Sequence, residues 1–283
     1  MKRKWSERIG FLFLYLSGLL VMSILGVILF DIISKGGGAI SWEFLTHPPQ
    51  QGMTEGGIFP AILGTFLVSV ITVFFAVPFG MFAAIYLHEY ARPGKMTRLI
   101  RLAIRNLSGV PSIVYGLFGV VLFVQMMRIG TSVLSAGLTL GLLTLPWTIT
   151  ACEEALKTVP KSYREGALAL GATKWCTIRT NVLPYAIPGM MTGMILGLAR
   201  AAGETAPILF IGAAFFLPHL PKSPFDQFMA LPYHLYIMAT QHHAIEKVRP
   251  LAYGTALVLL GLVLLLNISA IFVRYRFRKR MKR

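Results

Sequence analysis

Two charged residues stand inside one of the most apolar stretches of the sequence. Arg200 and Glu204 lie in the run 185–217, which holds no other charge. A charge in the hydrocarbon region of a membrane costs about 2.5–3.5 kcal/mol, so both side chains must face protein or water. A guanidinium can hold two oxygens of a tetrahedral oxyanion at once. Glu204 can hold Arg200 in place or accept a proton from a partly protonated oxyanion. The pair therefore predicts an anion site or gate.

The residues beside this pair indicate a weakened helix. Gly203 and Pro207 loosen the helix near the charges, and Thr205 completes the candidate path or gate. At 1.5 Å per residue, Arg200 should lie past the middle of the membrane, towards its outer side. An alternative stays open, because charges four residues apart can also form a self-neutralising ion pair within the helix bundle.

The polar segment 152–184 carries turn signals at regular places. Pro160 suits the first position of a helix, Gly171 suits the left-handed residue after a helix, and Thr173 can cap a second helix. We expect a helix over 161–170, a glycine turn and a second helix. Tyr163, Ala167 and Leu170 should share one face of the first helix, where Gly166 lets another surface approach closely. The alternative is an amphipathic helix that lies on lipid.

Motifs for hydrolysis are missing from the sequence. It has no G-x-x-x-x-G-K-[ST] phosphate loop, no G-x-S-x-G elbow and no H-E-x-x-H pair. We therefore expect no catalytic residue, no metal and no cofactor in this chain, which is not an enzyme by itself. His242 and His243 have no Cys or carboxylate at ligand spacing, so we expect exposed loop histidines.

The composition is that of an integral membrane protein. Apolar residues make up 55% of the chain and charged residues only 13%, about half of the ~25% usual for soluble domains. The mean hydropathy is +0.68. Six apolar runs are long enough to cross about 30 Å of hydrocarbon, which takes about 20 helical residues. They are 11–33, 58–87, 107–127, 129–151, 185–217 and 251–273. The predicted fold class is all-α, with six transmembrane helices.

The positive charges predict how the chain sits in the membrane. Most of the 27 Lys and Arg lie in four segments: 2–8, 92–105, 157–179 and 274–283. Because cytoplasmic loops are enriched in Lys and Arg, both termini should be cytoplasmic. The net charge of +16 is then a topology signal, and a nucleic-acid partner is not expected. We divide the chain into 1–57, with the first span and an outer loop, and a core, 58–283, whose cytoplasmic loop is 152–184.

The segment 152–184 resembles the EAA loop of ABC-importer permeases, whose pattern is E-A-A-x3-G-x9-I-x-L-P. Glu165, Ala167 and Gly171 keep that pattern, and so does the spacing to Leu183-Pro184. Two positions depart from it: Gly166 replaces the first Ala, and Asn181 stands where Ile is usual. The resemblance implies that this loop docks in a groove of a cytoplasmic ATPase and carries its motion to the membrane helices.

Two further stretches look like those of phosphate-specific (Pst) importer permeases, most of all the PstA type. They are R-A-A-G-E-T-A-P at 200–207 and L-S-G-V-P-S-I-V-Y-G at 107–116. The resemblance implies a type I ABC importer permease of the MetI-like fold, in the bacterial inner membrane. Its implied partners are a PstC-like permease, two PstB-like ATPases that bind ATP and Mg, a PstS-like phosphate-binding protein and phosphate itself.

Other functions fit the same sequence features. A permease of this fold can carry another oxyanion, such as sulfate, molybdate or phosphonate. A membrane scaffold or sensory subunit would signal phosphate status without transport, and would not need the ATPase loop. A proton-coupled carrier would transport without any ATPase.

Overall fold

The computed structural model describes residues 2–280, with the side chains of 10–276 and 279. Five long helices form most of it: α1 (Lys2–Gly36), α3 (Phe59–Ile85), α6 (Val133–Lys157), α9 (Leu183–Ala202) and α12 (Ile245–Arg280). The shorter helices are α2 (Trp42–Thr46), α4 (Lys95–Leu107), α5 (Ser112–Gly119), α7 (Lys161–Ala169), α8 (Lys174–Thr177), α10 (Ala206–Ile211) and α11 (Leu231–Thr240). Turns of π-helix cover Tyr86–Tyr90, Val120–Met126 and Ile178–Val182, and 3-10 turns cover Gly37–Ala39 and Gln51–Met53. The strands β1 (Pro49–Gln50) and β2 (Glu55–Gly56) form one small antiparallel pair.

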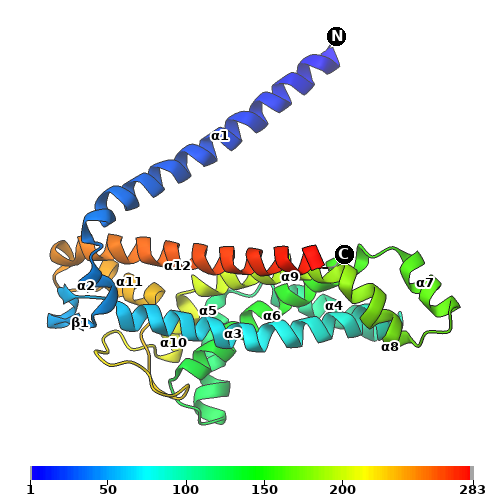
Figure 1. Cartoon of the computed structure of the whole chain (residues 1–283). Helices are drawn as coiled ribbons and strands as arrows, with labels where there is room; N and C mark the ends of the chain where they lie inside the picture. Colours follow the sequence, from blue (N-terminus) through cyan, green and yellow to red (C-terminus); the bar gives the residue numbers. More distant parts are fainter. Residues whose placement is uncertain (1, 281–283) are drawn as a thin grey trace.

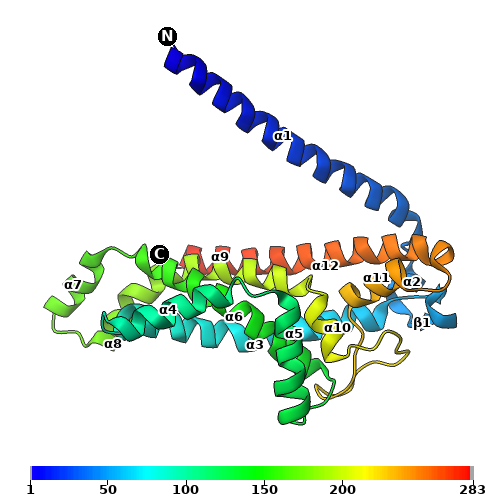
Figure 2. The ribbon, with the colours of Figure 1, turned by 180° about the vertical axis from the view of Figure 1, so that it is seen from behind.

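The helices α3, α6, α9 and α12 run side by side along the long axis of the molecule (Figure 1). One end of this bundle carries β1, α2 and α11, and the other carries α7 and α8; we call them the β1 end and the α7 end. The view from behind shows α5 standing across the bundle axis, while α4 runs along it (Figure 2). Helix α1 projects away from the bundle and meets α12 near its own C-terminal end.

Five helical stretches are long and apolar enough to cross a membrane, and a bent pair brings the number to as many as six. Five of the predicted spans thus have a matching helix. The run 107–127 does not form one straight helix, because Lys95–Leu107 and Ser112–Met126 meet at an angle of 101°. Pro111 precedes α5 and disfavours a continuous helix through the corner. The Tyr115 hydroxyl closes the corner by donating to the Leu107 carbonyl at 2.9 Å.

The predicted span 185–217 is also shorter as a helix than expected. Helix α9 ends at Ala202, and α10 begins only at Ala206. Pro207 has no backbone N–H to donate and fits only the first turn of α10. Gly212, with φ of +84°, ends α10 in the left-handed conformation that glycine adopts without strain.

Small residues allow α6 to lie close to its neighbours. A side chain at Gly193 of α9 would collide with Ala151, and one at Gly119 would collide with Thr139. The buried apolar side chains around α6 include Leu140, Leu156 and Met190. Helix α6 is therefore the centre of the bundle, and the residues that other helices bring to its side define the site.

His242 differs from the prediction of exposed loop histidines, whereas His243 is exposed as predicted. His242 is buried, and its Nε2 lies 2.7 Å from the Gly52 carbonyl, while its Nδ1 accepts from the Ala244 N–H at 3.1 Å. Because Nδ1 accepts, Nε2 carries the proton and donates to Gly52. His242 thus ties the turn between β1 and β2 to the start of α12, and its role here is structural.

Candidate functional site

Arg200 and Glu204 lie together at the break between α9 and α10. Arg200 is in the last turn of α9, and Glu204 follows the helix end, with its N–H donating to the Ala201 carbonyl at 3.2 Å. The Arg200 Nε donates to Glu204 Oε1 at 3.4 Å. The Arg200 side chain is 51% exposed and that of Glu204 only 16%. The contact is long for a charge-assisted hydrogen bond, so it orients the guanidinium without using all of its donors.

Trp147 of α6 is a third member of this site, which the sequence analysis missed. Its ring lies under the Arg200 guanidinium, with 5.1 Å between the ring centroid and Cζ. Trp147 is near the middle of α6, so the guanidinium lies beside the middle of that helix. A Trp in an apolar run gives no local signal for such a contact, since 53 positions separate it from Arg200.

The donors of Arg200 face open space. Among the side chains that the structure describes, Nη1 and Nη2 of Arg200 have no hydrogen-bond acceptor. Trp147, Leu196 and Gly203 are exposed around it. Since a charged side chain in a membrane bundle faces protein or water, this exposed surface is the candidate path. Thr205 is half-buried and precedes α10.

The two stretches that resemble Pst permeases meet in space. A side chain at Gly116 of α5 would press against the Cα of Pro207 at 2.9 Å, and α5 packs along α10. The corner at 107–116 therefore supports the short helix that follows Arg200 and Glu204. Neither stretch predicts this contact by itself, because nearly a hundred residues separate them.

The segment 152–184 has the local structure that its sequence predicts. Pro160 precedes α7, Gly171 adopts φ of +82°, and the Thr173 hydroxyl caps α8 by accepting from the Cys176 N–H at 3.3 Å. Of the three side chains expected to share one face, Tyr163 and Ala167 do so, four residues apart in α7, whereas Leu170 lies beyond the helix. Ala167 is buried, Tyr163 packs on Tyr185 with ring centroids 5.3 Å apart, and Leu170 is 90% exposed just after the helix end. Glu165 and Gly166 are exposed or half-exposed on α7.

A buried ion pair holds α7 against the bundle. The Arg164 Nη2 lies 2.6 Å from Glu89 Oε1, and Nε donates to the same carboxylate at 3.1 Å. The same guanidinium donates to the Val159 and Leu156 carbonyls, at 2.9 and 3.1 Å, which are free at the end of α6. Nothing local in the sequence indicates this pairing, because Glu89 ends the second span and Arg164 lies in the loop.

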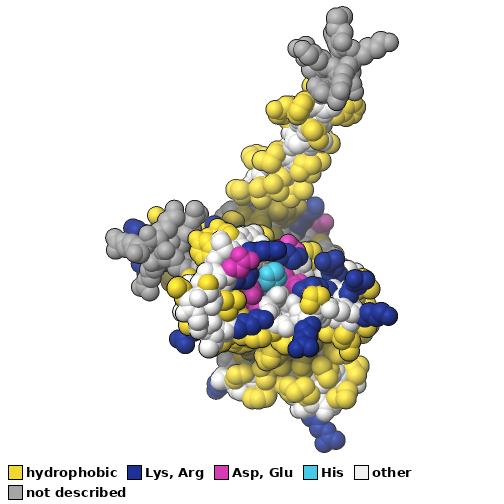
Figure 3. Space-filling model, turned by 90° about the vertical axis from the view of Figure 1, so that its right-hand side faces the viewer, with side chains coloured by type: hydrophobic (Ala, Val, Ile, Leu, Met, Phe, Trp, Pro, Cys, Tyr) yellow, Lys and Arg dark blue, Asp and Glu magenta, His cyan; other side chains and the backbone are white. Residues whose placement is uncertain are grey.

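The surface of the α7 end is strongly basic. Figure 3 looks at this end and shows Lys and Arg side chains around its rim, with carboxylates and a histidine between them. A second ion pair lies here, with Arg101 Nε 2.9 Å from Glu153 Oε1. Among the described residues, no three His, Cys, Asp or Glu side chains are placed to hold a metal ion. The end face is thus suited to contact with a macromolecule or a membrane surface.

Comparison with known proteins agrees with this architecture. Residues 76–283 match the family described as binding-protein-dependent transport system inner membrane component. The chain is 32% identical over 289 residues to the phosphate transport system permease protein PstA 1 of Mycobacterium tuberculosis, covering 100% of this chain and 92% of that protein. It is 31% identical over 281 residues to a probable ABC transporter permease, YqgI, of Bacillus subtilis, covering 95% of each. The structure is similar to one of the MetNI methionine ABC transporter in an inward-facing conformation, with a TM-score of 0.58, 19% identity and coverage of 78% of this chain and 94% of that one.

The family match covers most of the chain, and the PstA relative matches its full length. The fold similarity to a MetNI chain agrees with the helical arrangement around α6. Such proteins are the permease components of transporters and not the ATPase components. The chain therefore belongs to the family of binding-protein-dependent transport system inner membrane components, as a multi-pass permease subunit of a type I ABC importer.

Proposed function

We propose that this permease is the PstA-like half of a phosphate importer. The observation that carries the proposal is the Arg200 guanidinium, held by Glu204 and Trp147 with its two terminal nitrogens free. Two free nitrogens in one plane match two oxygens of a tetrahedral oxyanion. The PstA name of the Mycobacterium tuberculosis relative supports phosphate over other oxyanions.

The remaining parts of the importer follow from this assignment. A PstC-like permease completes the path, a PstS-like binding protein delivers phosphate at the β1 end, and two PstB-like ATPases bind ATP and Mg at the α7 end. Both termini are cytoplasmic, so the α7 end lies in the cytoplasm. Phosphate moves by alternating access, with Arg200, Gly203, Glu204 and Thr205 lining or gating its path.

Coupling to ATP hydrolysis runs through the loop 152–184. Leu170 and Gly171 are exposed at the turn after α7 and are free to contact an ATPase. Motion of α7 reaches α3 through the Arg164–Glu89 pair and α6 through the carbonyls that Arg164 binds. Among the other loop positions, Tyr163 and Ala167 pack α7 against the bundle, and Glu165 and Gly166 are exposed, where an ATPase surface can approach closely.

The test is ATP-dependent phosphate uptake by the reconstituted complex with Arg200→Gln and Arg200→Lys beside the parent. Loss of one charge-assisted contact to the anion lowers the rate about ten- to a hundredfold in Arg200→Gln. Arg200→Lys keeps the positive charge but not the bidentate geometry, so its uptake rate should lie between those of the parent and Arg200→Gln. Assembly and ATPase activity are checked for each complex.

Two results would contradict the proposal. Uptake at the parent rate by Arg200→Gln would leave Arg200–Glu204 as a structural pair. Parent complexes that take up sulfate, molybdate or phosphonate in preference to phosphate would assign another oxyanion to the same permease.

A further inference from the structure

Helix α4 has two chemically different sides, and neither is fully used within the chain. One side carries Lys95, Arg98, Arg101 and Arg105, at the three- and four-residue spacing of one helix face. The other side carries Met96, Leu99 and Ile100, which are 70%, 60% and 40% exposed. A helix with basic residues and exposed apolar residues suits the end of a membrane-spanning bundle, where headgroups and acyl chains meet.

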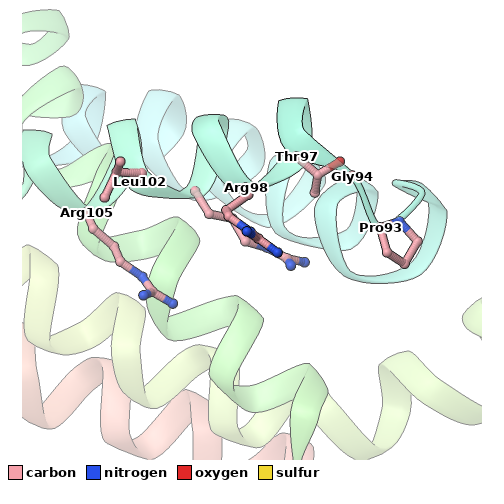
Figure 4. A pocket seen from close by; sticks show the side chains of 7 residues that line it. Pro93, Gly94, Thr97, Arg98, Leu102 and Arg105 are labelled. Atoms are coloured by element: carbon pink, nitrogen blue, oxygen red, sulfur yellow. The ribbon is translucent and has the colours of Figure 1, made fainter.

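The basic side forms a groove. It has a volume of about 370 Å³ and is lined by Pro93, Gly94, Thr97, Arg98, Arg101, Leu102 and Arg105. Arg98 and Arg105 extend to the same side of α4 (Figure 4). Among the described side chains neither has an acidic partner or a hydrogen-bond acceptor, whereas Arg101 is fixed by Glu153 at 2.9 Å and by the Leu87 carbonyl at 2.7 Å. The groove thus has one anchored arginine and two with free donors.

The Arg101 contact places the groove at a membrane boundary. Leu87 is near the end of the apolar stretch Phe59–Tyr90, which is long enough to span a membrane. The groove therefore lies where the second span leaves the hydrocarbon, at the level of lipid headgroups. An apolar groove of about 480 Å³ begins at Ile104, next to Arg105, and continues past Leu107 to Val114 of α5. It can take an acyl chain, which a free anion does not need.

We propose that the groove of α4 binds the phosphate group of an anionic lipid from the leaflet at the α7 end. Two arginines with free donors match the oxygens of a phosphodiester, and a third is anchored beside them. Basic residues at this level attract anionic lipids in any case, but a groove with a fixed arginine predicts one retained lipid and not a diffuse layer. This site is separate from Arg200 and does not depend on the identity of the transported anion.

The probe is phosphatidylglycerol, counted on the purified complex by native mass spectrometry during stepwise delipidation. The parent should retain one phosphatidylglycerol per copy of this chain, and Arg98→Gln/Arg105→Gln should lose it. Arg276→Gln/Lys279→Gln is the matched control, because it removes the same charge from exposed positions near the C-terminal end of α12, outside the groove and outside the loop 152–184. Thermal unfolding of each complex checks that the exposed substitutions leave it folded.

A second set of measurements distinguishes a bound lipid from bound inorganic phosphate. Millimolar inorganic phosphate should not displace the retained lipid, and phosphatidylcholine should not replace it. Displacement by inorganic phosphate would assign the groove to the free anion. Equal loss of lipid in the control variant would mean that general charge attraction explains the lipid binding. Retention of the lipid in Arg98→Gln/Arg105→Gln would place its site elsewhere. Loss of the ATPases from that variant with lipid still bound would make α4 a protein contact. Each of these results would overturn the proposal.

Discussion

At the scale of single residues, the site depends on how Arg200 is oriented. Its carboxylate contact is long, at 3.4 Å, and its side chain is half exposed. The indole of Trp147 gives the guanidinium a flat surface, which restrains it without consuming an N–H donor. An arginine held by a ring face keeps its in-plane donors available, so in the proposed anion path Trp147 is a positioning residue.

Replacing Trp147 tests this role. Trp147→Leu should raise the phosphate concentration for half-maximal uptake about two- to fivefold, since an exposed cation–π contact contributes ~0.5–1 kcal/mol. Trp147→Phe keeps a ring face and should lie nearer the parent. Uptake measured over a range of phosphate concentrations checks both. Equal half-maximal phosphate concentrations for Trp147→Leu and the parent would mean that Glu204 alone orients Arg200.

His234 makes the stability of the chain depend on pH. It lies in α11, outside the apolar spanning stretches, and is 2% exposed with no partner for Nδ1. Burial lowers the pKa of His234 from 6.5 to about 4, against a smaller opposing effect of the Phe215 backbone. Between these two pKa values His234 is protonated in the unfolded chain but neutral in the folded one. The stability of the folded chain therefore falls as the pH drops from about 6.5 to about 4, and it is retained above that range.

Thermal unfolding of the purified complex at pH 7 and at pH 5 measures this effect. The shift in pKa corresponds to a loss on the order of 3 kcal/mol over the whole range. His234→Gln cannot take up the proton and should show a smaller decrease between the two values. The same decrease in parent and variant would assign the pH dependence to other groups.

At the scale of elements, the attachment of α7 is the feature that we propose to transmit motion. Arg164 joins it to Glu89 at the end of the second span, and to two carbonyls at the end of α6. Glu89 is only 7% exposed and Arg164 only 20%. Removing one partner of a largely buried ion pair leaves the other charge unpaired, which costs about 3–5 kcal/mol.

Variants of this ion pair separate coupling from assembly. Glu89→Gln should lower the ATPase stimulation caused by the loaded binding protein about tenfold or more, while the basal ATPase rate of the assembled complex changes little. The double variant Glu89→Arg/Arg164→Glu restores opposite charges and should recover part of the stimulation. Lys157→Gln breaks only an exposed pair with Glu154 and serves as control. Full stimulation in Glu89→Gln would show that α7 moves the bundle through other contacts.

At the scale of the whole molecule, the apolar surface exceeds what one chain can bury. The apolar stretch Gly10–Ala39 is not buried, and exposed Phe and Leu side chains line α3, α5 and α12. Such a surface requires lipid or a partner permease around it. The basic α7 end and the opposite β1 end then lie on the two sides of the membrane.

A natural cysteine reports which side is which. Cys176 is exposed beside α7, whereas Cys152 is fully buried in α6. A membrane-impermeant maleimide should label Cys176 in inside-out vesicles and leave right-side-out vesicles unlabelled. Trp42 lies at the β1 end and is 80% exposed. In a Cys176→Ser background, Trp42→Cys should be labelled in right-side-out vesicles and not in inside-out vesicles. Labelling of Cys176 from outside would reverse the proposed orientation.

The local features of this protein follow from its amino-acid sequence. Apolar runs of spanning length predicted five of the helices, because the hydrocarbon requires satisfied backbone groups over a fixed thickness. Pro160, Gly171 and Thr173 predicted the turn around α7, because each favours one backbone geometry or cap. The expected charge pair at Arg200 and Glu204 also formed, since four residues on one chain cannot lie far apart.

The contacts between distant residues depend on how the helices pack. Trp147 reaches Arg200 because α6 and α9 pack closely through Gly193, and Glu89 reaches Arg164 because α7 folds back on the end of the second span. The corner at Pro111 and the break after Ala202 have local causes, but the packing of α5 on α10 at Gly116 and Pro207 brings these two breaks together. Helical periodicity has a reach of a few residues, whereas these contacts depend on how the helices pack together.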